Sequence, residues 1–313
     1  MTTKSGGDLM EQVLVSARAA GLPSYLAERV ARFTPLTRPA AAGRALVACD
    51  VDRTLVYSSK ALGLPGADRD APRLVVGEVY LGVPAAFYTR DAEQLLVALA
   101  AESTFVPTTT RTRAQFARIR LPVEPRYAIT SNGGHLLVDG TPDRDWSAHV
   151  TAILAGISAP LAEVTWHLQK VADPLWTRAQ RVAEELFVYL VVERSELPAT
   201  FLDELSGWCA ERAWTVSLQG RKLYCVPSPL TKSAAITEVA WRAGTARTVA
   251  AGDSLLDADL LASAEEGVRP AHGELHDRRW LLPHLTVTER SGVLGGEEVV
   301  ARLLASVLAG RPL

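Results

Sequence analysis

Short apolar runs and amphipathic stretches alternate along most of the chain, and this alternation predicts buried strands joined by helices. The run at 45–49 is apolar throughout and ends in acidic residues, which is typical of a strand in a parallel sheet covered on both faces. Comparable runs follow at 104–107, 127–130, 248–251, 267–270 and 285–288. Helical spacing of apolar residues is found at 92–101, 113–119, 232–243, 255–264 and 297–308. The predicted fold class is α/β, with a doubly wound parallel sheet as its core.

Two segments outside this repeat have patterns of their own. Apolar residues recur at helical spacing between 9 and 33, so we expect two short helices in an N-terminal extension over 1–43 that ends in a linker at 38–43. After the first strand, segments 74–81 and 85–89 are rich in Val, Tyr and Phe and flank a Gly-Val-Pro turn. That arrangement predicts a hairpin or flap.

The middle third predicts a separate α+β unit with one antiparallel sheet. Strands are expected at 163–171, 186–192, 214–218 and 223–226, and helices at 146–157, 177–185 and 198–212. Because the strand–helix alternation resumes near 232, we expect this unit, residues 135–226, to be inserted into a core formed by 44–134 and 227–313. Its tryptophans are expected to form its core, and they are Trp146, Trp166, Trp176, Trp208 and Trp214.

Composition narrows the partners and the compartment. Hydrophobic residues make up 48% of the chain and charged residues 22%, and the formal net charge is -2, so no bulk attraction to nucleic acid or to an anionic membrane is expected. Three widely spaced cysteines indicate neither a disulfide framework nor a zinc knuckle. No apolar run reaches membrane-spanning length and the N-terminus lacks a signal-peptide core, so a cytoplasmic location is expected. Nothing in the composition indicates an oligomeric state.

Polar side chains follow three of the predicted strands. The first strand is followed by Asp50 and Asp52, and a third by Asp253 and Asp257. The second is followed by Thr109, whose neighbours Thr108 and Thr110 leave the assignment open by one residue. In open α/β sheets the carboxyl ends of the strands form the ligand crevice. The full set expected there is Asp50, Asp52, Thr109, Lys232, Asp253 and Asp257.

The chemistry of this set points to phosphoryl transfer. Clustered carboxylates repel one another unless a cation holds them, and ligands that are all oxygen favour Mg²⁺ over zinc. A hydroxyl and the ammonium of Lys232, which opens a predicted helix, are suited to holding a phosphoryl group. Phosphoryl transfer needs mainly positioning and charge neutralisation. Arg111 is either a substrate contact or a surface charge on this evidence.

Four stretches resemble, in order and type, the motifs of the haloacid dehalogenase-like phosphatases. They are DVDRTLV at 50–56, the threonine at 109, the lysine at 232 and GDSLLD at 252–257, and the resemblance covers roughly 44–308. ITSNGG at 129–134 resembles the strand that precedes the larger α/β caps of this family, and TTRTRAQF at 109–116 resembles the corresponding stretch in the sucrose-phosphate and mannosyl-3-phosphoglycerate phosphatase branch. The resemblance implies a Rossmann-like core, with the inserted unit as a type-2 α/β cap.

The same resemblance implies a role for each residue. Asp50 would be the nucleophile that forms an aspartyl-phosphate, and Asp52 the general acid and then the base. Mg²⁺ would be held by Asp50, the backbone carbonyl of Asp52, and Asp253. Asp257 completes this metal-binding set by orienting Lys232 or a metal-bound water. Thr109 and Lys232 would bind the phosphoryl oxygens.

The expected activity is hydrolysis of a small phosphorylated metabolite, with a sugar phosphate as the substrate class. A sugar phosphomutase using the same intermediate and a non-catalytic binding or regulatory protein are the alternatives. The chain departs from the family pattern at three positions, where Arg53 and Thr110 replace glycines and Leu256 an asparagine. These departures leave the subfamily open.

Overall fold

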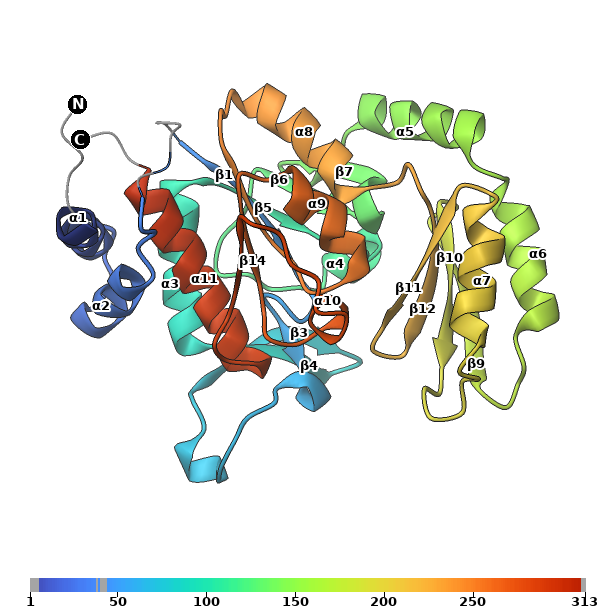
Figure 1. Ribbon diagram of the computed structural model, residues 1–313, viewed down its shortest axis with the longest axis horizontal. Coiled ribbons are helices and arrows are strands. Elements are labelled where there is room, and N and C mark those ends of the chain that lie inside the picture. Colours follow the sequence, from blue (N-terminus) through green and yellow to red (C-terminus); the bar gives the residue numbers. More distant parts are fainter. Residues whose placement is uncertain (1–5, 38, 40–43, 311–313) are drawn as a thin grey trace.

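A large, mainly parallel sheet lies between two layers of helices in the computed structural model, which describes residues 6–37, 39 and 44–310 (Figure 1). The strand order is β15-β14-β13-β1-β5-β6-β7-β8. The strands are β1 (Leu46–Asp50), β5 (Thr104–Thr108), β6 (Tyr127–Thr130), β7 (His135–Val138), β8 (Thr141–Pro142), β13 (Thr248–Ala251), β14 (Glu266–Arg269) and β15 (Leu285–Val287). From β15 to β6 neighbouring strands pair in parallel, which confirms the predicted fold class.

The central strand β1 is buried along its whole length because helices cover both faces of the sheet. Val47 and Cys49 pack into the layer of α3 (Arg90–Glu102) and α11 (Gly292–Ala309), whereas Leu46 and Ala48 face α8 (Lys232–Ala243) and α9 (Ala258–Ser263). The expected N-terminal helices are α1 (Gly6–Ala19) and α2 (Ser24–Arg32), and both pack on α11. Most of the linker predicted at 38–43 lies outside the described residues.

A second sheet forms the inserted unit, with the order β11-β12-β10-β9 and antiparallel pairing throughout. Its strands are β9 (Thr177–Ala183), β10 (Phe187–Val192), β11 (Trp214–Gln219) and β12 (Lys222–Pro227). Helices α6 (Leu161–Val171) and α7 (Phe201–Ala210) lie on the side of this sheet away from the core, and α5 (Arg144–Ile157) leads into the unit (Figure 1). Trp146, Trp176 and Trp214 are buried as expected, but Trp166 is 58% exposed.

Two elements of this unit were predicted with the wrong type. The strand predicted at 163–171 is helix α6, in which Val164 and Leu168 lie one turn apart and are both fully buried. The helix predicted at 177–185 is strand β9, whose charged and polar composition suits an edge strand. Pairing with β10 therefore overrides the local preference of β9.

The main sheet extends further along the chain than the predicted core. Residues 135–142 were assigned to the inserted unit, but β7 pairs antiparallel with β6, and β8 pairs with β7. This pairing places both strands in the large sheet. The division into domains otherwise stays a prediction.

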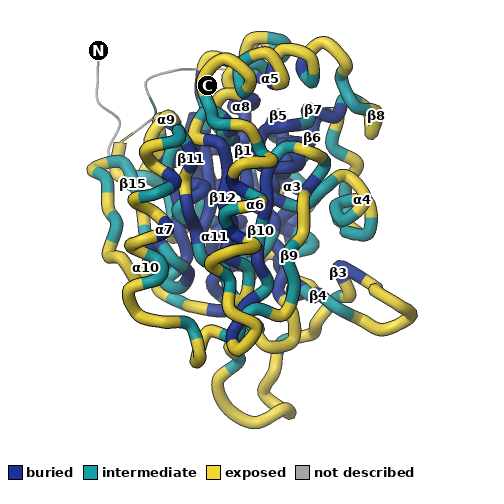
Figure 2. Tube along the Cα trace, turned by 90° about the vertical axis from the view of Figure 1, so that its right-hand side faces the viewer, coloured by how far each residue is buried: buried dark blue, intermediate teal, exposed yellow. Residues whose placement is uncertain are grey.

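The predicted flap is a small sheet of β2 (Tyr57–Ser58), β4 (Val83–Thr89) and β3 (Leu74–Tyr80). The 3-10 helices η1 (Ser59–Ala61) and η2 (Asp68–Asp70) lie in the loop before β3. The tip of the β3–β4 hairpin is exposed (Figure 2). Among the described residues no single helix is long and apolar enough to cross a membrane, although α5 and α6 together, bent by 65°, pass the same test of length and composition.

Candidate active site

The first two aspartates are placed by the end of β1. Asp50 is the last residue of the strand and only 6% exposed, and it pairs in register with Thr108 at the end of β5. The chain then turns sharply, because Arg53 N donates to Val56 O at 2.8 Å. Since β13 lies on the other side of β1, the carboxyl ends of three neighbouring strands meet here, as the sequence predicts.

A buried acidic cluster occupies this edge of the sheet. Asp50, Asp253 and Asp257 each offer a carboxylate oxygen, and these oxygens lie within 4.8 Å of one another. Burial raises the pKa of Asp50 to about 8, with the charge of Asp257 adding to the rise and Lys232 opposing it. Burial and then the charge of Asp50 raise the pKa of Asp253 well above its usual range. The cluster therefore needs positive charge to stay ionised.

Lys232 supplies part of that charge. It is the first residue of α8, which begins where the hydroxyl of Thr231 accepts from Ala234 N, and it is fully buried. Its Nζ donates to Asp50 and to Asp257, each at 2.5 Å. Burial alone would lower the pKa of Lys232, but the two carboxylates outweigh it and raise the pKa. The lysine is therefore held protonated at the centre of the cluster.

Asp257 has both carboxylate oxygens engaged by the protein. One accepts from Lys232, and the other accepts from the backbone N–H of Asp253 at 3.2 Å and from the N–H and hydroxyl of Ser254 at 2.9 and 2.7 Å. This arrangement fixes the position of Lys232. These hydrogen bonds suit a role for Asp257 in orienting Lys232 better than a role in orienting a metal-bound water.

Asp52 is held by an arginine that sequence reasoning had left without a role. Arg111 donates through Nε and Nη2 to the two oxygens of Asp52, at 2.7 and 2.8 Å. Its Nη1 donates to Glu78 of β3 at 2.9 Å, and Glu78 also accepts from Arg118. Burial would raise the pKa of Asp52, but the hydrogen bonds and charge of Arg111 lower it overall. The sequence did not predict a role for Glu78. The one signal for such a role is that Glu78 is the single acid in an otherwise apolar hairpin strand.

The inserted unit contributes side chains on the same side as Asp52. Burial raises the pKa of Tyr224 of β12, while the charge of Lys222 opposes the rise and that of Asp52 adds to it. The charge of Tyr224 makes the largest contribution to the raised pKa of Lys222. Burial opposes this rise, and the charge of Asp52 adds to it. A separate contact is the hydrogen bond of 2.7 Å from the hydroxyl of Ser217 to Glu274. Strands β11 and β12 therefore face the candidate site.

Thr109 completes the predicted set, and Arg53, a departure from the family pattern, lies beside that set. Thr109 is fully buried directly after β5, and its hydroxyl accepts from Arg111 N at 3.1 Å. Arg53 adopts a φ of 63°, which favours the glycine that it replaces, and its Nε lies 3.6 Å from Asp253. The side chain of Arg53 is 35% exposed and partly neutralises the cluster from the solvent side.

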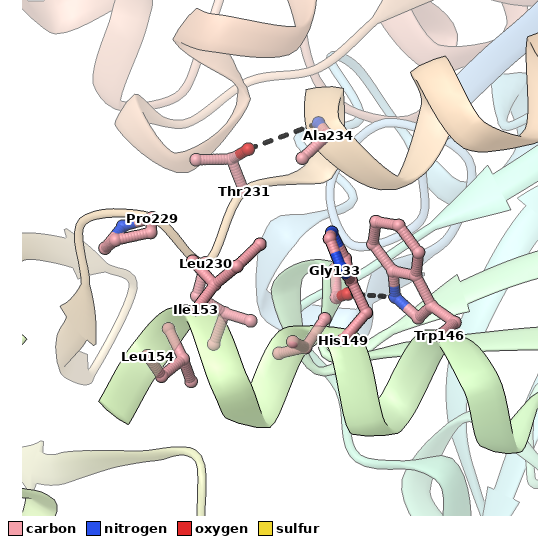
Figure 3. Close-up of a pocket in the computed structure, with 10 residues that line it drawn as sticks. Gly133, Trp146, His149, Ile153, Leu154, Pro229, Leu230, Thr231 and Ala234 are labelled. Atoms are coloured by element: carbon pink, nitrogen blue, oxygen red, sulfur yellow. Dashed lines mark hydrogen bonds between the residues drawn. The ribbon is translucent and has the colours of Figure 1, made fainter. Parts of the chain in front are cut away.

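A small cavity lies behind the loop that carries Lys232 (Figure 3). Its volume is about 40 Å³, close to that of one water molecule, and its walls are mainly apolar. Trp146 donates to the carbonyl of Gly133 at 2.8 Å on one side, and Asn132 donates to the carbonyl of Leu230. None of the acidic residues lines this cavity, so it is a feature of packing between α5 and the loop before α8.

Comparisons with known proteins show the fold. No protein-family model matches the sequence, and no curated protein matches it either. The sucrose-phosphatase of Synechocystis, solved with sucrose and phosphate, is 17% identical, with a TM-score of 0.54 over 80% of this chain and 93% of that chain. Protein 0175 of Thermoplasma acidophilum is 14% identical, with a TM-score of 0.50 over 82% of this chain and 95% of that chain. The chain therefore shares the fold of the sucrose-phosphatase, a Rossmann-like core with a cap.

Proposed function

We propose that the protein is a Mg²⁺-dependent phosphomonoester hydrolase. The observation that carries the proposal is the fully buried Lys232, which bridges Asp50 and Asp257 beside Asp253 at the carboxyl edge of the sheet. A protonated lysine among buried carboxylates is an arrangement for binding a phosphoryl group and neutralising its charge. The fold shared with the sucrose-phosphatase supports the same reading.

The reaction would proceed in two displacements at phosphorus, the first by Asp50 and the second by water. An oxygen of Asp50 attacks phosphorus, the bond from phosphorus to the substrate oxygen breaks, and the leaving alkoxide takes a proton from Asp52. Asp52 then removes a proton from a water molecule, which attacks the aspartyl-phosphate, releases phosphate and restores Asp50. Lys232 and Thr109 would bind the phosphoryl oxygens.

The lowered pKa of Asp52 matters for the order of these events. Arg111 holds Asp52 in the ionised form, which suits the water-activating step. To act first as an acid, Asp52 must be protonated and its double hydrogen bond with Arg111 must loosen. An anionic substrate that attracts Arg111 would have this effect.

The residues present fit a magnesium ion. Asp50, Asp253 and the backbone carbonyl of Asp52 would hold it, because they offer only oxygen ligands and the carboxylates already lie close together. The ion would neutralise charge on the transferring phosphoryl group. Asp257 is better suited to orienting Lys232, since its oxygens are taken by other donors.

A small phosphorylated metabolite is the proposed substrate, and a sugar phosphate the proposed class. The resemblance to the sucrose-phosphatase supports this class, and the face of β12 offers Tyr224 and Lys222 near Asp52 for contacts with the leaving group. A cytoplasmic location remains part of the proposal, and it rests on the composition alone.

Phosphate release from a panel of sugar phosphates tests the proposal. We expect release that requires Mg²⁺, stops on chelation and is abolished by Asp50→Asn. Asp139→Asn is the matched control, because Asp139 is exposed and its φ of 48° also suits asparagine. Full hydrolysis by Asp50→Asn would overturn the assignment of the nucleophile. Isomerisation that requires a bisphosphate activator would favour a phosphomutase, and tight ligand binding without turnover would favour a binding protein.

A further inference from the structure

Arg269, the last residue of β14, carries a buried charge without an acidic partner among the described residues. It is only 4% exposed. Its Nε donates to Trp280 O at 3.0 Å, and its Nη1 donates to Pro270 O at 3.3 Å and lies 3.1 Å from His276 Nδ1. All these partners are neutral when the imidazole is neutral, and burial lowers the pKa of Arg269. Buried charges in proteins are normally paired, so this guanidinium calls for an anion.

Two other arginines, one buried and one partly buried, do have acidic partners. Arg247 is equally buried and contacts Glu266 of β14. Arg111 is shared between Asp52 and Glu78. The comparison shows that the neutral surroundings of Arg269 are unusual within this protein.

Arg269 is one of the residues that line an open pocket of about 510 Å³, whose other lining residues are His276, Asp277, Arg279, Leu281 and Val287. A neutral His276 that accepts from Arg269 through Nδ1 carries its proton on Nε2, which makes Nε2 a second donor. Nη2 of Arg269 makes no hydrogen bond to any described residue. The polar groups of this pocket are therefore mainly positive or hydrogen-bond-donating, with Asp277 as the one acid among the lining residues, while most of the lining surface is apolar.

We propose that this cavity, the Arg269 pocket, binds a small oxyanion, a phosphoryl or carboxylate group. Arg269 and Arg279 would supply its charge partners, and the imidazole of His276 a hydrogen bond. An anion placed there would give the buried guanidinium the counter-charge that the described chain does not provide. The proposal does not depend on the proposed hydrolysis, because no residue of the acidic cluster lines the pocket.

The short helix α10 (Glu274–Asp277) joins the Arg269 pocket to the candidate active site. His276 and Asp277 line the pocket, whereas Leu275 N donates to the carbonyl of Asp253 at 3.0 Å. Glu274 accepts from Ser217 of the inserted unit. An anion that shifts α10 would therefore act on the backbone at Asp253 and on a contact with the inserted unit. Such coupling would be reciprocal between the two sites.

Imidazole resonances of the whole protein, titrated with inorganic phosphate at constant ionic strength, test the proposal. The signal of His276 is assigned from its loss in His276→Gln. We expect that signal to shift and saturate in the wild type, and Arg279→Glu to raise the half-saturating concentration by about tenfold or more. Arg69→Glu is the control, because it makes the same change in charge at an exposed site on the flap loop.

The outcomes separate the ligand classes and can refute the site. Saturation by phosphate but not by malonate identifies a phosphoryl ligand, and the reverse identifies a carboxylate ligand. A His276 signal that fails to saturate with either anion would overturn the proposal. An identical titration curve in Arg279→Glu would overturn it too, because the shift would then come from phosphate bound elsewhere.

Discussion

The substitution Gly133→Ala adds one methyl group and tests whether close packing against Thr231 is needed at the site. A control at another glycine with a positive φ measures the backbone strain alone. Gly133 has a φ of 101°, and a Cβ placed on it would lie 2.1 Å from the carbonyl oxygen of Thr231. The obstacle is backbone, so no side chain can rotate out of the way. Thr231 also caps α8, whose first residue is Lys232. We therefore expect Gly133→Ala to push the lysine loop away from the acidic cluster.

The magnitude has two parts. A left-handed backbone costs alanine about 1–2 kcal/mol, and forcing extra atoms into a packed interior typically costs about 1–3 kcal/mol more. Gly140→Ala is the matched control, because Gly140 has a φ of 76° with nothing within 4 Å of a built Cβ. It should lose only the first part. The difference between the two variants, about 1–3 kcal/mol, is then the cost of the contact with Thr231.

Urea unfolding and phosphate release measure the two consequences. Gly133→Ala should show the larger fall in the free energy of unfolding and a rate at least about tenfold lower, since small displacements of catalytic groups are costly. Gly140→Ala should keep the wild-type rate. Equal losses of stability in the two variants would refute the steric argument. A normal rate in a folded Gly133→Ala would refute the link from Thr231 to Lys232.

Three further predictions test other contacts. Glu78→Gln should lower kcat by about tenfold and the free energy of unfolding by about 1–3 kcal/mol, because Arg111 loses a charged acceptor. Steady-state kinetics and urea unfolding measure the two effects, and an unchanged kcat would contradict the prediction. Hydrogen bonds, above all the one from Arg242, lower the pKa of Asp143 in the folded protein. The ionised carboxylate therefore stabilises the fold at pH values above its unfolded pKa of about 3.9. This stabilisation is lost as the pH falls through the lower pKa of the folded state. The stability difference between wild type and Asp143→Asn, followed by unfolding from pH 7 to pH 2, should therefore shrink below about pH 4; a constant difference would argue against the pair. Arg53→Gly should lower the Mg²⁺ concentration for half-maximal activity, because a cation beside Asp253 is removed, and glycine adopts the φ of 63° freely; a higher requirement would contradict this.

The parallel core was predictable because its signals are local. A strand buried on both faces must be apolar along its length, so β1 and β13 are visible as short runs in the sequence. Parallel neighbours end at the same edge, which is why Asp50 and Asp253 could be brought together without coordinates. In the inserted unit the local signal fails, because β9 is an edge strand whose composition carries little information about pairing.

The surroundings of Asp52 were not predictable, since they depend on pairing between distant segments. Glu78 reaches Arg111 only because β3 folds back on β4 and an isolated bridge joins Glu78 to Ile119. No spacing in the sequence encodes that approach. Arg111 could accordingly be placed near the site but not given a partner.

The two proposed catalytic aspartates therefore differ in what holds them. Asp50 is fixed by β1 and by Lys232, both parts of the core. Asp52 is held by Arg111, which Glu78 of the flap also contacts, and it lies in the field of Lys222 from the inserted unit, which lowers its pKa. A movement of the inserted unit that withdraws Lys222 would make Asp52 easier to protonate while leaving the nucleophile in place. We therefore expect motion of this unit to regulate the proton transfers rather than the attack on phosphorus.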